Sequence, residues 1–179
     1  YLDLYGGHAV ISIGHSHPHF VRKISRQLRR IAFYSNAVQN PLQEQLASSI
    51  GEQSCLHDFE LFLCSTGAEA IENALKLSSF HTQRKKVIAF KGAFHGRTSA
   101  AVAVTDNISI NAPINSQHEV TFLPFDDIEA LEKELASETY CAVIFESIQG
   151  VGGLDQPNDS FVIAMDSLCK KYGTTLIAD

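Results

Sequence analysis

The sequence predicts an α/β fold in which a mostly parallel sheet is flanked by helices. Three observations support this prediction: short apolar runs typical of buried strands, helical periodicity between them, and alternation of the two from about residue 60 onward. The 179 residues, 45% hydrophobic and 19% charged, suffice for one globular domain or for part of a larger one.

The predicted strands are runs of continuous rather than alternating hydrophobicity. Parallel strands have this pattern because helices cover both faces of their sheet. The runs occupy residues 61–64, 87–90, 142–145 and 175–178, and a fifth strand is expected at 120–123.

Amphipathic helices are predicted between these strands, at residues 67–81, 126–137 and 160–172. Ser65 or Thr66 is available as the N-cap of the first helix. The last helix is expected to end at Gly173, a residue type that readily takes the left-handed conformation of a C-terminal cap.

The first 40 residues differ from the rest. They are rich in Gly, His and Pro and contain one amphipathic helix around residues 18–33. We therefore separate an N-terminal segment, residues 1–40, from an α/β region, residues 41–179. Because the chain begins at Tyr1 and stops at Asp179, directly after an apolar run, we expect it to be a fragment.

Composition argues against several classes of function. A net charge of -6, with no basic run longer than three residues, argues against a nucleic-acid partner and favours a small-molecule substrate. No signal peptide or membrane-spanning run is present in these residues. The four cysteines form no CxxC motif, which suits a reducing cytosol, and Cys64 and Cys141 are expected to be buried in apolar runs. His15, His17 and His19 have no Cys or carboxylate nearby to complete a set, so no metal site is predicted.

The first candidate site is Ser65-Thr66-Gly67-Ala68-Glu69-Ala70, where a predicted strand meets a predicted helix. A helix N-terminus presents free N–H groups and a positive dipole end, and a glycine allows close approach of a ligand, so a phosphate is the expected anion. The alternative is an ordinary N-cap. The lysine of a nucleotide P-loop is missing.

The second candidate is Phe94-His95-Gly96-Arg97-Thr98, in the loop after the strand at 87–90. An aromatic ring there can stack on a flat heterocycle, and an arginine can bind a substrate carboxylate through two hydrogen bonds. The alternatives are a core role for Phe94 and a surface ion pair for Arg97.

The third candidate is a pair of acids, Glu146 and Asp179, at the carboxyl ends of two predicted strands. Ligands of open parallel sheets collect at these ends, so both carboxylates are expected to face one crevice. An Asp in that position can keep a pyridine nitrogen protonated. The alternative is a turn residue at the end of a strand.

Taken together and in order, these motifs resemble the class III aminotransferases, which use pyridoxal 5'-phosphate (PLP). The similarity covers essentially the whole chain and is greatest to the acetylornithine and succinylornithine aminotransferase branch. It rests on Gly14-His15-Ser16-His17-Pro18, on the three site motifs, on Glu146-Ser147-Ile148-Gln149-Gly150 with Gly152-Gly153, and on Leu176-Ile177-Ala178-Asp179.

The resemblance implies a PLP-dependent transferase of fold type I and a role for each site residue. Residues 41–179 would be the first, incomplete part of the PLP-binding large domain, and residues 1–40 part of the small domain or its connection. The roles are phosphate binding by Thr66, Gly67 and Ala68; ring stacking by Phe94 with His95 beside it; pairing with the pyridinium nitrogen by Asp179; support at the ring edge by Glu146; and substrate carboxylate binding by Arg97.

Two features depart from a complete family member. The lysine that forms the Schiff base in this family lies downstream of the position of Asp179. No residue of this chain is therefore predicted to form the Schiff base or to be catalytic. The family usually reads Glu-Pro-Ile-Gln-Gly-Glu-Gly-Gly, where this chain has Ser147 for the proline and Val151 for the second glutamate. In relatives that use ornithine-like substrates that glutamate can pair with an active-site arginine, which Val151 cannot do.

The resemblance implies transamination of an N-acylornithine with 2-oxoglutarate in arginine biosynthesis, by a cytoplasmic homodimer. One alternative is another class III ω-aminotransferase acting on ornithine, 4-aminobutyrate or a biotin precursor. The other is a non-catalytic truncated remnant. Neither a membrane nor a nucleic acid is expected as a partner.

Overall fold

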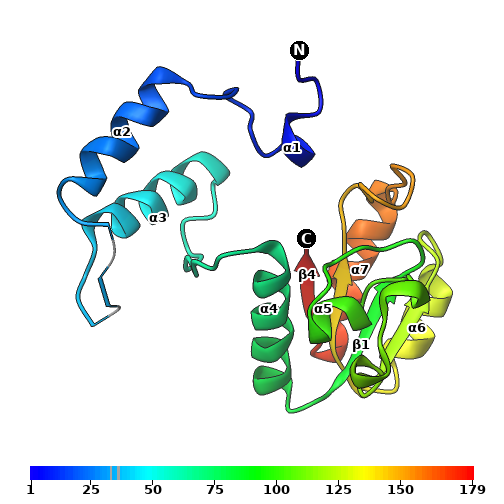
Figure 1. The fold of residues 1–179 in the computed structure, drawn as a ribbon. Helices are drawn as coiled ribbons and strands as arrows, with labels where there is room; N and C mark the ends of the chain where they lie inside the picture. Colours follow the sequence, from blue (N-terminus) through cyan, green and yellow to red (C-terminus); the bar gives the residue numbers. More distant parts are fainter. Residues whose placement is uncertain (33, 36) are drawn as a thin grey trace. The chain divides into compact units, whose positions relative to one another are not determined.

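The computed structural model describes residues 1–32, 34–35 and 37–179, apart from the side chains of residues 8 and 9. The chain divides into two compact units, Tyr1–Leu61 and Phe62–Asp179, whose elements are labelled in Figure 1. No described helix is long and apolar enough to cross a membrane.

The first unit is helical, with α1 (Gly6–Ala9), α2 (Pro18–Leu28) and α3 (Pro41–Ser54). The predicted helix at 18–33 begins at Pro18 as expected but ends at Leu28; residue 33 of that prediction lies outside the described residues. Helix α3 was not predicted. Neither α2 nor α3 has a buried residue, and the apolar side chains of α2 are exposed. The assignment of residues 1–40 to a small domain stays a prediction.

The second unit contains a four-stranded parallel sheet in the order β2-β1-β3-β4. The strands are β1 (Lys86–Phe90), β2 (Val120–Leu123), β3 (Tyr140–Phe145) and β4 (Thr175–Ala178). Four of the five predicted strands are therefore confirmed, and so is the predicted α/β class. Strand β3 is buried along its whole length, which explains its uniformly apolar sequence.

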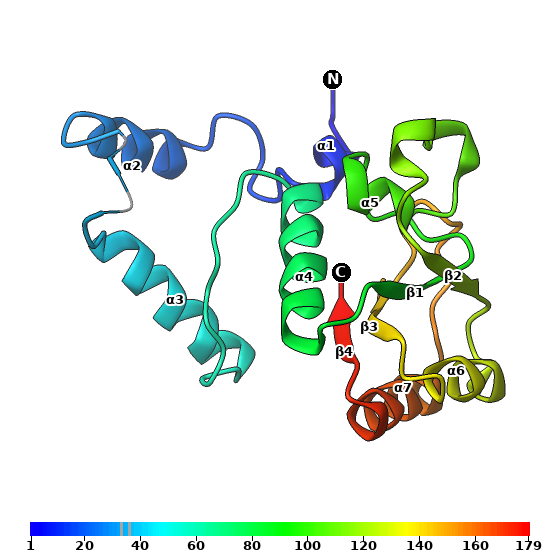
Figure 2. The same cartoon turned by 90° about the horizontal axis from the view of Figure 1, so that it is seen from below.

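Helices cover both faces of this sheet, as Figure 2 shows. On one face, α4 (Gly67–Thr82) and α5 (Ser99–Ala103) enclose a core with Ala142 and Ile144. On the other face, α6 (Ile128–Leu135) and α7 (Asp159–Tyr172) enclose a core with Val143 and Phe145. Alternate residues of β3 thus serve opposite cores, as the two-residue repeat of a strand requires. Two 3₁₀ turns, Ile108–Ile110 and Pro113–Asn115, lie between α5 and β2.

The ends of the helices follow local chemistry. Gly173 caps α7 with a φ of 60°, as predicted. Helix α6 is shorter than the predicted 126–137 because Asp126 has a φ of 64° and Asp127 is the N-cap, accepting a hydrogen bond of 2.9 Å from the Ala130 N–H.

The prediction of a strand at residues 61–64 is wrong. These residues pair with no described strand, and the side chains of Phe62 and Leu63 are exposed. The apolar run predicted burial, but a strand also needs a neighbour to accept and donate its backbone hydrogen bonds. For the same reason Cys64 is exposed rather than buried, whereas Cys141, in β3, is buried as expected.

Candidate functional site

The carboxyl ends of three neighbouring strands carry the predicted site residues. Glu146 directly follows β3, Asp179 directly follows β4, and the loop after β1 contains Phe94, His95 and Arg97. Phe145 and Ala178 are partners in the parallel register, so the two acids emerge side by side from adjacent strands. The expectation that both acids lie at one edge of the sheet agrees with this register.

Successive residues of the loop after β1 bind the two acids. The Phe94 N–H donates to Glu146 Oε2 at 3.0 Å, and the His95 ring nitrogen Nδ1 lies 2.7 Å from Asp179 Oδ2. Glu146 is buried, and the backbone N–H of Asp179 donates to the Phe145 carbonyl at 2.9 Å. The two acids therefore hold this loop against the ends of β3 and β4.

His95 is buried, and its hydrogen bonds indicate its tautomer. Its backbone N–H donates to Thr105 Oγ1 at 2.9 Å, while its ring nitrogen Nε2 has no partner among the described residues. A neutral ring that donates from Nδ1 to Asp179 leaves only a lone pair unpaired at Nε2, which costs less than burying an unpaired N–H. In this tautomer His95 donates a hydrogen bond from Nδ1 to the carboxylate of Asp179.

The N-terminus of α4, the predicted anion site, has backbone N–H groups without partners among the described residues. Thr66 is the N-cap, and its Oγ1 accepts a hydrogen bond of 3.1 Å from the Glu69 N–H, while the Glu69 carboxylate accepts one of 2.7 Å from the Ser65 N–H. The N–H groups of Gly67 and Ala68 bind no other described residue. No atom lies within 4 Å of the position a Cβ would take at Gly67, which leaves room for a ligand.

A close contact joins this helix end to the loop. Gly96 has a φ of 136°, and a Cβ at this position would lie 2.8 Å from the Ala68 Cβ and 3.1 Å from the Ala101 Cβ. Only a residue without a side chain fits this junction. The N-terminus of α4 and the loop with Phe94 and His95 are therefore immediate neighbours.

Arg97 is exposed, and its guanidinium carbon lies 5.9 Å from the centre of the Phe94 ring. This distance is within the range of a cation–π contact. The Phe94 ring is half-buried. Both side chains thus stay accessible to a ligand at the strand ends.

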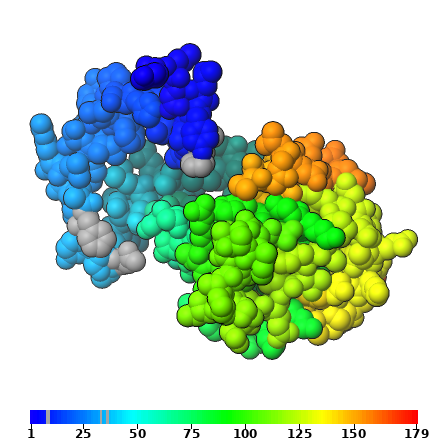
Figure 3. Space-filling view, turned by 45° about the vertical axis from the view of Figure 1, so that its right-hand side comes forward, coloured from blue at the N-terminus to red at the C-terminus, as the bar shows by residue number. Residues whose placement is uncertain are grey.

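Three buried or half-buried residues that hold the site together were given no role from the sequence: Thr105, Glu72 and Gln149. Thr105 binds the His95 N–H, Glu72 binds the N-terminus of α5, and the Gln149 side chain donates to the Lys91 carbonyl at 2.9 Å. The contacts join residues 10 to 58 positions apart, so no local pattern could have identified them, although Gln149 belongs to the motif Glu146-Ser147-Ile148-Gln149-Gly150. The backbone of Gln149 also closes the turn of residues 149–155, in the orange part of Figure 3, where Val151 and Leu154 are exposed.

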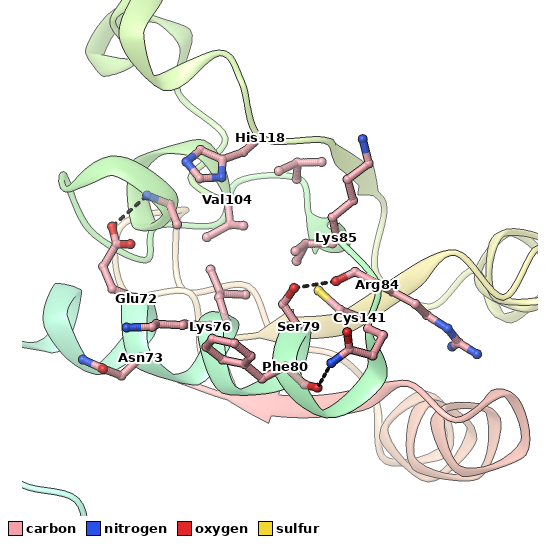
Figure 4. A pocket seen from close by; sticks show the side chains of 15 residues that line it. Glu72, Asn73, Lys76, Ser79, Phe80, Arg84, Lys85, Val104, His118 and Cys141 are labelled. Carbon is pink, nitrogen blue, oxygen red and sulfur yellow. Dashed lines mark hydrogen bonds between the residues drawn. The ribbon is translucent and has the colours of Figure 1, made fainter.

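An open groove of about 970 Å³ lies beside α4, away from the predicted site residues, none of which lines it. It is lined by α4 and by the first residues of β1, β2 and β3, as seen in Figure 4. Among the described residues, no three His, Cys, Asp or Glu side chains are grouped as a metal site would require.

The chain is similar to known proteins over its whole length. The sequence matches the family "Aminotransferase class-III" over residues 1–179. It is 40% identical to the acetylornithine aminotransferase of Archaeoglobus fulgidus and 38% identical to that of Bacillus anthracis, in both cases over 100% of this chain. The chain spans 47% and 46% of those two proteins, which is about half of their length.

Solved structures show the same fold. The ornithine aminotransferase of Toxoplasma gondii, with partial occupancy of PLP, superposes with a TM-score of 0.86 at 27% identity, over 100% of this chain and 44% of that one. The taurine:2-oxoglutarate aminotransferase of Bifidobacterium kashiwanohense, in complex with PLP and glutamate, has a TM-score of 0.87 at 24% identity, over 100% and 46%. A family match over the whole chain, a parallel sheet of this topology and acids at its strand ends lead to one conclusion: the chain belongs to the class III aminotransferases.

Proposed function

We propose that the complete protein is a PLP-dependent aminotransferase that moves an amino group from an N-acylornithine, first of all N-acetylornithine, to 2-oxoglutarate. The observation that carries this proposal is the pairing of Glu146 and Asp179 with successive residues of one loop beside the N-terminus of α4. The substrate class follows the names of the relatives at 35–40% identity, all acetylornithine aminotransferases. Arginine biosynthesis is the pathway that this substrate suggests.

The residues present fit the phosphate of the cofactor. The free N–H groups of Gly67 and Ala68 point from the positive end of α4, and open space adjoins Gly67. The Thr66 hydroxyl accepts one hydrogen bond through its oxygen and keeps its proton to donate to a phosphate oxygen.

The residues at the strand ends fit the pyridine ring. Phe94 is half-buried, which leaves part of its surface available for stacking, and the His95 ring holds the carboxyl group of Asp179 in place. Asp179 would hold a proton on the ring nitrogen. When bound, PLP supplies an electron-withdrawing ring that stabilises negative charge on the substrate carbon.

Glu146 and Arg97 complete the proposed site. Glu146 Oε2 accepts a hydrogen bond from the Phe94 N–H, so this acid fixes the backbone that carries the stacking ring. Arg97 is exposed and would bind the α-carboxylate of the substrate through two hydrogen bonds. The lysine that would bind the cofactor covalently stays a prediction for a segment beyond Asp179.

We also propose a cytoplasmic homodimer. Four free thiols, two of them buried, suit a reducing compartment. Leu77 and Phe80 on α4 are 63% and 67% exposed, and these large apolar side chains suit a protein interface better than solvent. Static light scattering of the complete protein tests this assembly; a monomer at micromolar concentration would contradict it.

The experiment that tests the function is the absorbance spectrum of the complete protein purified with PLP. We expect a visible band that is lost on adding N-acetylornithine and returns with 2-oxoglutarate, because the amino group is transferred in two half-reactions. A band that ignores N-acetylornithine but responds to ornithine or 4-aminobutyrate would refute the substrate and keep the aminotransferase. Absence of any band would refute the enzyme and favour a non-catalytic remnant.

A further inference from the structure

We propose that Glu72 is a positioning residue that sets the spacing between the phosphate end and the ring end of the cofactor site. This inference rests on the proposed function. Glu72 belongs to α4 and touches none of the groups assigned to the cofactor, so its action is indirect.

One carboxylate oxygen of Glu72 accepts three hydrogen bonds from the start of α5. The Thr98 hydroxyl donates to Oε1 at 2.7 Å, the Ala100 N–H at 2.7 Å and the Ala101 N–H at 3.1 Å. Figure 4 shows the Glu72 side chain reaching from α4 toward this segment. Because Thr98, the N-cap of α5, makes no side-chain cap bond of its own, Glu72 takes over the capping of that helix.

The charge of Glu72 suits this position. A carboxylate binds backbone N–H groups at a helix N-terminus more strongly than a neutral acceptor does, because it also meets the positive end of the helix. Ala101 is fully buried, so its N–H has no access to water in place of Glu72. Loss of the Glu72 carboxylate would therefore leave a buried N–H group of α5 without a hydrogen-bond acceptor.

Glu72 works together with a second contact on the same face of α4. Ala68 and Glu72 are four residues apart, and residues at this spacing are neighbours on a helix surface. Ala68 meets Gly96 at a distance that allows no side chain, and Glu72 binds residues 98, 100 and 101. One face of α4 thus holds the whole segment 96–101 in place.

This clamp connects the two ends of the cofactor site. The first turn of α4 carries the free N–H groups for the phosphate, and the clamped segment directly follows Phe94 and His95, which serve the ring. A displacement of about 1 Å between the two ends would misalign a rigid cofactor, and such errors cost activity steeply.

The test compares Glu72→Ala, Glu72→Gln and Thr98→Val in the complete protein. Glu72→Gln keeps an acceptor oxygen but removes the charge. Thr98→Val removes the hydroxyl that donates a hydrogen bond to Glu72. Glu129→Gln is the matched control, since Glu129 is an exposed acid in the first turn of α6, across the sheet. We would measure the dissociation constant of PLP, the circular dichroism of the bound cofactor at saturation, and the melting temperature of the apo form.

We expect Glu72→Ala to raise the PLP dissociation constant about tenfold and to weaken the dichroic band of the saturated enzyme. Glu72→Gln and Thr98→Val should have smaller effects of the same kind, and Glu129→Gln none. A fall in apo melting temperature with unchanged PLP affinity and dichroism would overturn the proposal and leave Glu72 a structural residue. If the unsubstituted protein binds no PLP, the proposed function fails instead.

Discussion

At the scale of single residues, the pair of His95 and Asp179 is the contact on which the proposed chemistry depends most. The two residues are 84 positions apart, and the His95 side chain is fully buried. Since Nε2 lacks a partner among the described residues, the ring orients Asp179 through Nδ1 alone. The role of His95 can therefore be tested by replacing a single N–H donor.

We expect His95→Phe to lower kcat about tenfold with little change in KM, because Asp179 loses the donor that aims it at the ring nitrogen. His95→Asn retains an N–H near the Nδ1 position and should recover part of the loss. Steady-state kinetics of both variants of the complete protein checks this. Equal losses in the two variants would show that ring packing, not the hydrogen bond, is what matters.

Burial also predicts a pH effect at Cys169. Desolvation, with a smaller contribution from the charge of Asp166, raises the pKa of this thiol to about 12. The unfolded chain releases the proton near its ordinary pKa of about 9, so the folded state loses stability as pH rises from about 9 toward 12. The sign follows because the unfolded state binds fewer protons throughout that range.

Urea denaturation of the native protein and of Cys169→Ala measures this effect. Between pH 8 and about 10.5, the unfolding free energy of the native protein should fall by roughly 2 kcal/mol more than that of the variant. Parallel pH dependence in the two proteins would contradict a buried neutral thiol.

At the scale of elements, the junction of α4 with the loop after β1 sets the shape of the site. Gly96 combines a φ of 136° with contacts that leave no room for a methyl group. Gly150 lies in another loop near the strand ends, has no positive φ, and has open space where its Cβ would be. Gly150 is therefore a matched control for a substitution of Gly96.

Gly96→Ala is expected to destabilise the protein by about 1–3 kcal/mol and to weaken PLP binding, since both the backbone conformation and the contact with Ala68 oppose a side chain. Gly150→Ala should change stability by less than about 0.5 kcal/mol. Thermal unfolding and PLP titration of both variants check this. A Gly96→Ala variant as stable as Gly150→Ala would contradict the close contact.

At the scale of the whole molecule, apolar surface and strand edges lack partners within the described residues. β2 and β4 are the two edges of the sheet, and the apolar residues 61–64 join no ladder. The helices α2 and α3 have no buried residue. Exposed edges and apolar surface are templates for association with other chains.

The 179 residues expressed by themselves are therefore expected to self-associate, whereas the complete protein should be a single species of defined mass. Light scattering of the two samples, side by side at equal concentration, provides the measurement. A monodisperse monomer from the 179-residue polypeptide would show that these surfaces need no partner.

The sequence by itself determined the strands at 87–90, 120–123, 142–145 and 175–178, the cap at Gly173 and the acids at the strand ends. Those features have local causes. Continuous hydrophobicity, helical spacing and capping residues are all patterns of residues that are neighbours in the sequence. It also identified the family, because several motifs in order carry more information than any one of them.

Only the tertiary structure decided which groups meet. The parallel register of β1, β3 and β4 brings Phe94 to Glu146 and His95 to Asp179, over 52 and 84 residues of sequence. The packing of α4 against α5 brings Glu72 to the start of α5. The failed strand at 61–64 has the same physical reason: hydrophobicity is a property of a segment, whereas a hydrogen bond needs a partner whose position the fold alone sets.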